Sequence, residues 1–417
     1  MTLCKSLHRQ LLVLPFLVFT IVGAGAVTEI KPERDDQVIE TLPAARTFYR
    51  SGVPRSATSV PAAGTVKDSP SLSLPPPQVS AALTAEEALS QAQAWVGEAR
   101  QSGDTRFWGR AQAVLSPWWD KPDAPVAISV MQATVQQGRH EFAASHATLK
   151  AALKRDRGNA QAWLTLASLE RLSGRYTESL LACNAVAQAR QLWYAKACSL
   201  ETESLQGQTA QTPRDFQTLI SAAQAPAQVA WVASLLAESE ERAGHDAAAA
   251  KAYQQSLKAD PDLYTALAYS DLLLRQSPSK AAQPKVALKV LANLPETDAV
   301  LIRRAHALRL DGQHGWQALT TELHERDAAL RRRGDDVSLH SREAGLIALW
   351  LDDKPSAALA LAQQNLTLQK EPIDWWLALQ SARAARDEKA LAEVQAGIAV
   401  IGLKDRRLQT LPGQSKL

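Results

Sequence analysis

Eight histidines are the first residues here that invite chemistry, because imidazole is the commonest protein ligand for metal ions. Four of them, His306, His314, His324 and His340, fall within one region. A zinc site on a helix needs two histidines four residues apart, or cysteine partners at metal spacing. No two histidines lie four residues apart, and no cysteine lies near these four. The sequence therefore predicts that these histidines pack against other residues or face solvent. It predicts no metal site and no cofactor.

Acidic and basic clusters are the next candidates for chemistry. The pairs Asp335-Asp336 and Asp352-Asp353 fall at predicted loops or helix starts, where carboxylates favour the helix dipole. The run Arg331-Arg332-Arg333 before Gly334 is typical of the last turn of a helix with a glycine cap. The sequence contains no glycine-rich phosphate loop and no nucleophile elbow. We therefore predict no catalytic residues and a protein that is not an enzyme.

Two tryptophan doublets, Trp118-Trp119 and Trp375-Trp376, could stack on sugar rings. Successive residues of a helix point about 100° apart, so we expect one ring of each doublet to pack between helices. Packing between helices is the interpretation that we favour for both doublets, with sugar stacking as the alternative.

Two cysteines, Cys183 and Cys198, follow the N-terminal region. They fall in adjacent predicted helices that would pack side by side, so a disulfide is one alternative in an oxidising compartment. The other is a pair of small buried thiols, which the sequence favours because a bridge needs Cα atoms within about 7 Å.

The elements that position these residues begin after an N-terminal region of different character. Lys5 and Arg9 precede an apolar run that ends in small residues, which is typical of a signal peptide over residues 1–26 cleaved near Ala26. An uncleaved membrane anchor is the alternative. Residues 27–83 are rich in Pro, Ser and Ala without a sustained period, which predicts a flexible linker. We expect the protein to be periplasmic or secreted.

The charge of the chain argues against some partners. The signal holds two of the 46 basic residues and none of the 43 acidic ones, so the mature chain has 46 − 2 = 44 basic residues and a net charge of +1. Such a balance predicts no nucleic-acid partner, and membrane contact only through an uncleaved signal.

From residue 84 to about 400 the pattern is helical throughout, and residues 401–417 are expected to form a C-terminal tail. Thr84 and Glu87 have the spacing of a capping box. Apolar-periodic runs of about a dozen residues alternate with Gly or Pro breaks, and no alternating strand is evident. Gly174 and Gly244, each between two such runs, are 70 residues apart, close to twice a 34-residue period.

The unit around these glycines resembles the tetratricopeptide repeat. Gly244, Ala249, Tyr253 and Pro261 follow its order of glycine, small residue, aromatic residue and proline, and the unit from Ala160 matches its first half. Weaker copies extend the resemblance over nearly all of residues 84–400. It implies an all-α fold, a right-handed superhelical solenoid of eight or nine antiparallel helix pairs whose concave side is lined by the first helix of each pair.

The resemblance also implies a non-catalytic scaffold that binds another protein or peptide of the cell envelope on its concave side. The family's usual contact positions correspond here to the following residues: Leu164, Ser168, Arg171, Trp231, Glu238 and Glu241. The Lys and Asn with which some members bind a C-terminal carboxylate are absent, because Leu164 and Ser168 stand at those positions. The alternative function is a scaffold that handles glycan, in polysaccharide export or at peptidoglycan.

Overall fold

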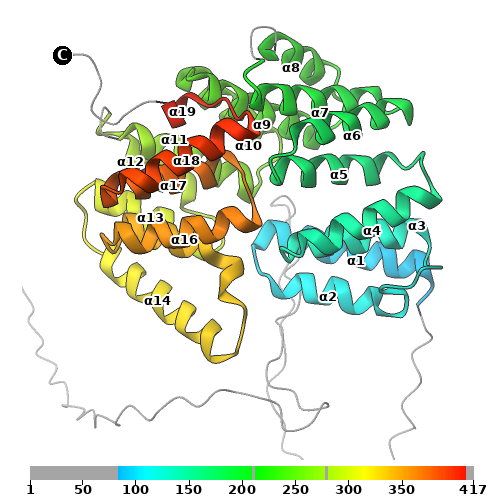
Figure 1. Cartoon of the computed structure of the whole chain (residues 1–417), viewed down its shortest axis with the longest axis horizontal. Helices are drawn as coiled ribbons and strands as arrows, with labels where there is room; N and C mark the ends of the chain where they lie inside the picture. Colours follow the sequence, from blue (N-terminus) through cyan, green and yellow to red (C-terminus); the bar gives the residue numbers. More distant parts are fainter. Residues whose placement is uncertain (1–82, 209–211, 278–279, 410–417) are drawn as a thin grey trace, which may run out of the picture.

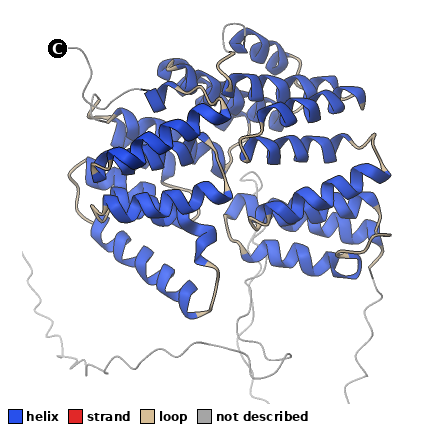
Figure 2. Cartoon of the chain, viewed as in Figure 1, coloured by secondary structure: helices blue, strands red, loops and turns tan. Residues whose placement is uncertain are grey.

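The computed structural model describes residues 83–208, 212–277 and 280–409, which contain helices and no strand (Figure 2). The expected signal peptide and all but the last residue of the expected linker lie outside the described residues. Within them, the all-α prediction is confirmed.

Nineteen α-helices follow one another in the described part of the chain (Figure 1). The first ten are α1 (Ala85–Ser102), α2 (Arg106–Leu115), α3 (Val126–Gly138), α4 (Phe142–Arg155), α5 (Ala160–Leu172), α6 (Tyr176–Gln188), α7 (Leu192–Leu205), α8 (Thr212–Ser221), α9 (Pro226–Ala243) and α10 (Asp246–Ala259). The others are α11 (Leu263–Gln276), α12 (Gln283–Leu291), α13 (Asp298–Leu310), α14 (Trp316–Arg332), α15 (Ser341–Trp350), α16 (Pro355–Leu368), α17 (Pro372–Ala385), α18 (Glu388–Ile401) and α19 (Arg406–Gln409). Two short 3₁₀ helices are η1 (Ser116–Trp118) and η2 (Val337–His340).

Consecutive helices pack as pairs, from α1 with α2 to α17 with α18. The described residues hold nine such pairs, in agreement with the predicted eight or nine. We call the first helix of each pair its A helix and the second its B helix. Most A helices also contact the A helix of the next pair, as α1 does α3 and α3 does α5, so the A helices form an inner layer.

Local sequence explains the shape of the pairs. The capping box predicted at the start of α1 is formed, with the Thr84 side chain accepting from the Glu87 backbone and the Glu87 side chain accepting from Thr84. Ala167 and Ala182, which face each other across the α5–α6 pair, are almost fully buried, and their small size lets the helices approach closely. Gly174 ends α5 with a φ of 73°, a conformation that glycine adopts without the steric cost of a Cβ.

Cys183 of α6 and Cys198 of α7 form a disulfide in the structure, in contrast to the separate thiols that the sequence favoured. Their Cα atoms are 5.6 Å apart, within the range that a bridge requires. The pairing follows from the close approach of a B helix to the next A helix. We expect freshly isolated protein to show no reactive thiol at these positions in non-reducing mass spectrometry after alkylation. Alkylation of both cysteines without prior reduction would contradict the bridge.

The array folds back so that its C-terminal part packs against the C-terminal ends of early A helices. The main-chain N–H of Lys370 donates to the carbonyl of Leu172 at 2.7 Å, and that of Lys404 donates to the carbonyl of Leu205 at 2.8 Å. These carbonyls end α5 and α7, where a helix has no internal donors left for them. In Figure 1, α19 accordingly lies beside α9.

Residues 401–409 belong to this packed region, which corrects the expected tail as far as residue 409. Leu403, Asp405 and Leu408 are 3%, 1% and 6% exposed. Gly207 allows the close approach, because a Cβ there would lie 2.9 Å from the Cβ of Lys404. The charged run from Lys404 to Arg407 resembles a solvated tail in sequence, but Arg407 pairs with the distant Glu241 and with the buried Asp405.

Candidate functional site

The A helices present the same positions to the concave side in each early pair. Counted back from the residue of positive φ that ends each helix, the positions three and six residues earlier face inward. The ending residues are Gly103, His140, Gly174, Gly207 and Gly244. The inward residues three before them are Arg100, Gln137, Arg171, Ser204 and Glu241, and those six before them are Gly97, Thr134, Ser168, Glu201 and Glu238. Four of the six predicted contact residues therefore occupy these two positions.

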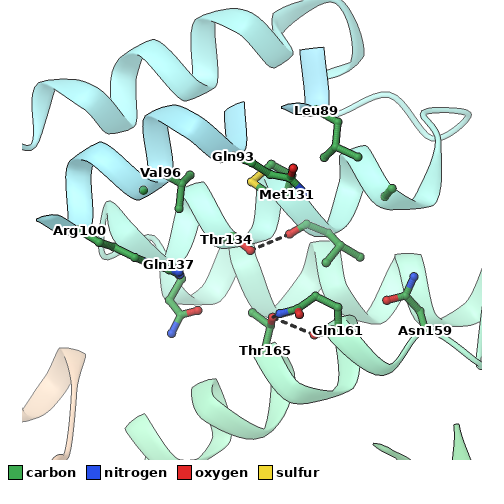
Figure 3. Close-up of a pocket in the computed structure, with 13 residues that line it drawn as sticks. Leu89, Gln93, Val96, Arg100, Met131, Thr134, Gln137, Asn159, Gln161 and Thr165 are labelled. Atoms are coloured by element: carbon green, nitrogen blue, oxygen red, sulfur yellow. Dashed lines mark hydrogen bonds between the residues drawn. The ribbon is translucent and has the colours of Figure 1, made fainter. Parts of the chain in front are cut away.

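One part of the concave side is an open groove across α1, α3 and α5 (Figure 3). It has a volume of about 450 Å³. Its lining residues are Leu89, Gln93, Val96, Gly97, Arg100, Ala127, Val130, Met131, Thr134, Gln137, Asn159, Gln161 and Thr165. Aliphatic side chains alternate with amides and hydroxyls, so the groove can bury apolar groups and also offer hydrogen-bond donors and acceptors.

A second, smaller part of the concave side is a chamber of about 70 Å³ between α5, α7, α9, α11 and the start of α17. Arg171 and Glu201 form an ion pair across it at 2.7 Å. Glu238 accepts from the Tyr264 hydroxyl at 2.7 Å. Burial raises the pKa of Glu238, while the nearby Arg242 guanidinium and the Tyr264 hydroxyl oppose that rise. The chamber is therefore polar, and its own side chains satisfy most of its charges.

Glu241 anchors the fold-back beside this chamber. Its carboxylate accepts from the Tyr253 hydroxyl at 2.8 Å and from Arg407 of α19 at 2.9 Å, and Arg275 of α11 also donates to it. Burial alone would raise the pKa of Glu241, but Arg407 and Arg275 lower it to about 2. Arg407 also pairs with Asp405, whose side chain is fully buried. This ion-pair cluster joins the C-terminal end of the chain to α9.

The predicted contact residues thus have different surroundings. Ser168 borders both regions, since it lines the chamber and lies 3.5 Å from the Gln137 amide of the open groove. Arg171 and Glu238 line the chamber, and Glu241 is buried beneath α19. Two others take part in packing. Leu164 packs beside the disulfide, and Trp231 packs against Trp193.

The open groove was not predicted, and none of the six predicted contact residues is among those that line it. The two clear copies of the repeat in the sequence lie at α5 and α9, whereas the sequences of α1 and α3 match the repeat only weakly. The signal that would have found the groove is the count back from Gly103 and His140, which gives Arg100 and Gln137.

Several of the histidines and tryptophans considered for chemistry take part in packing or in ion pairs. His306 stacks on Trp350, with ring centroids 4.4 Å apart, and His324 pairs with Asp352 at 3.0 Å. Trp375 is 5% exposed in the core. Within residues 83–208, 212–277 and 280–409, no three His, Cys, Asp or Glu side chains are grouped to hold a metal ion.

The remaining tryptophans of the doublets also pack against the cores: Trp118, Trp119 and Trp376. The predicted end of a helix near the arginine run is confirmed, because α14 ends at Arg332 and Gly334 has a φ of 77°.

The comparison with known proteins follows from this geometry. Nine antiparallel pairs, eight of them turning at a described residue of positive φ and with their A helices in an inner layer, are the arrangement that the repeat resemblance implied. The fold is that of a tetratricopeptide-like repeat array. No family model matches the chain, and no curated protein matches it.

Solved structures of tetratricopeptide proteins resemble this array at low sequence identity. One is a tetratricopeptide repeat protein from Parabacteroides merdae, 12% identical, with 71% of this chain and 98% of that chain covered and a TM-score of 0.31. Another is the TPR domain of P58(IPK), 14% identical, with 78% of this chain and 95% of that chain covered and a TM-score of 0.21. Among the described helices, none is long and apolar enough to cross a membrane.

Proposed function

We propose that this tetratricopeptide-like array is a non-catalytic scaffold that binds an extended segment of another protein in the open groove across α1, α3 and α5. The observation that carries the proposal is the groove itself. It is larger than the chamber, with about 450 Å³ against about 70 Å³, and it places inward positions of three successive A helices side by side. An extended chain can run across all three helices, as repeat surfaces allow.

The lining favours a peptide over a glycan. Side-chain amides carry both donors and acceptors, so Gln93, Gln137 and Gln161 can bind the N–H and C=O groups of a peptide backbone. Val96 and Met131 offer apolar surface for its side chains. Sugar rings are usually bound against aromatic faces, and no aromatic residue lines the groove among the described residues. The tryptophan doublets, which supported the glycan alternative, pack against the helices instead.

We also propose that the protein is exported and meets a cell-envelope partner. Residues 1–26 have the composition of a signal peptide, which supports export. The bridge between Cys183 and Cys198 also supports it, because disulfides persist in oxidising compartments.

Filling the groove should abolish binding. Gly97 lies within α1 and faces the groove, and a Cβ built on it meets no atom within 4 Å. We therefore expect Gly97→Phe to fold normally, because a helix interior tolerates most residues better than glycine. The added ring should lower partner recovery at least tenfold. The measurement is capture of crosslinked envelope proteins on the mature chain from Val27, quantified by mass spectrometry.

Gly109→Phe is the matched control. Gly109 also lies within a helix with no atom within 4 Å of a built Cβ, but it is exposed on α2, a B helix outside the groove. A protein recovered with the wild type and with Gly109→Phe, but lost with Gly97→Phe, supports the proposal. Equal recovery with both variants would place the binding surface elsewhere.

A further inference from the structure

At one inward position, the open groove differs from the rest of the concave side in whether a charged residue has an ion-pair partner. Three early A helices have a charged residue three positions before the residue of positive φ: Arg100 in α1, Arg171 in α5 and Glu241 in α9. Arg171 is neutralised by Glu201 at 2.7 Å. Glu241 is neutralised by Arg407 at 2.9 Å and by Arg275. At the chamber and beside it, each charge at this position therefore has an ion-pair partner within the chain.

Arg100 has none. No acidic side chain within the described residues forms an ion pair with it, and the other twelve residues that line the groove are neutral. Arg100 is an exposed residue on the wall of the groove, and partial desolvation by the surrounding helices lowers the pKa of its guanidinium. Figure 3 shows its side chain extending from α1 toward Gln137 of α3, along the groove. A guanidinium in such surroundings is a strong donor for a carboxylate.

We infer that the segment bound in the open groove is an acidic peptide in which an Asp or Glu side chain pairs with Arg100, while its backbone contacts the amides of α3 and α5. This inference rests on the proposed function. The net positive charge of the groove lining comes from Arg100 alone, so the ligand is expected to need one well-placed acidic residue and not a run of them.

The length of the segment follows from the spacing of the helices. Packed helices lie about 8–10 Å apart, so three A helices span about 20 Å. An extended chain rises about 3.3 Å per residue, so about six residues cross the groove. The carboxylate would lie toward one end, because Arg100 is in the last turn of α1, the first of the three helices.

The test uses two pools of random fluorescent heptapeptides with both ends blocked. One pool contains Asp and Glu, and the other has Asn and Gln in their place. Each is passed over the immobilised mature chain, and retained peptides are sequenced and measured by anisotropy at low and physiological salt. The variants are Arg100→Gln and, as a control of equal charge change, Arg155→Gln, an exposed residue at the end of α4 outside the groove.

We expect the wild type and Arg155→Gln to retain acidic peptides, and Arg100→Gln to bind the same peptides roughly tenfold more weakly, as loss of a charge-assisted hydrogen bond predicts. Equal retention from both pools, with unchanged affinity in Arg100→Gln, would overturn the inference and leave the proposed groove intact. Retention from neither pool would overturn both. Retention of acidic peptides that Gly97→Phe does not reduce would show that they bind outside the groove, and would also overturn the inference.

Discussion

Arg407→Met lowers the free energy of unfolding by about 3–5 kcal/mol, because it removes one partner of a buried ion-pair cluster. The Asp405 carboxylate, fully buried, loses the guanidinium that neutralises it. The Glu241 carboxylate, 3% exposed, loses one of its two arginines. Urea denaturation followed by circular dichroism measures the change.

A second measurement shows that the loss comes from the fold-back. The amide of Lys404 donates to the carbonyl of Leu205, so its hydrogen exchange reports docking of the C-terminal segment on α7. We expect the substitution Arg407→Met to accelerate hydrogen exchange at the Lys404 amide more than at the amides of α3. The control is Lys389→Met, at a side chain that is 88% exposed and makes only a surface pair with Glu393. If Arg407→Met matched Lys389→Met within 0.5 kcal/mol, a typical scatter for surface changes, the cluster would not hold the fold-back.

This fold-back marks the limit of what the sequence could predict. The helix pairs were predictable because each depends on local signals, such as the capping box at Thr84 and the turn at Gly174. The pairing of Glu241 with Arg407 joins residues 166 positions apart, and no periodic pattern relates them. In sequence, Glu241 looks like a charged residue on an exposed helix face and Arg407 like part of a polar tail. Only long-range packing shows that each neutralises the other.

The candidate site was likewise predictable only where it depends on local signals. Repeat register alone identified the inward positions, as Ser168 and Arg171 show by lining the concave side. Register could not show which part of that side stays open, because this depends on where the last helices dock. The structural feature that best indicates function is therefore Arg100, which has no ion-pair partner among the described residues. This difference can be recognised only when the partners of Arg171 and Glu241 are known.

The stability of the protein should also fall in acid through His306. Burial first, and then the nearby Arg309 and Arg303 guanidinium groups, lower the pKa of this imidazole from 6.5 to about 3. Below pH 6.5 the unfolded chain binds a proton at this position that the folded protein does not bind until about pH 3. The free energy of unfolding therefore falls by about 1.4 kcal/mol per pH unit in this window, or by about 3 kcal/mol at pH 4.

His306→Phe should remove this dependence. Phenylalanine keeps an aromatic ring against Trp350, and the buried Nδ1 atom that it replaces has no hydrogen-bond partner among the described residues. Urea denaturation at pH 8, 6, 5 and 4 should show the wild type losing stability relative to the variant as the pH falls. The acid loss from Glu241, whose pKa is about 2, affects both proteins equally and cancels in the difference. His314→Ala, at an exposed loop residue, should follow the wild type. Parallel profiles for the wild type and His306→Phe would mean that His306 is protonated within the fold, with Trp350 then stacked on a cation.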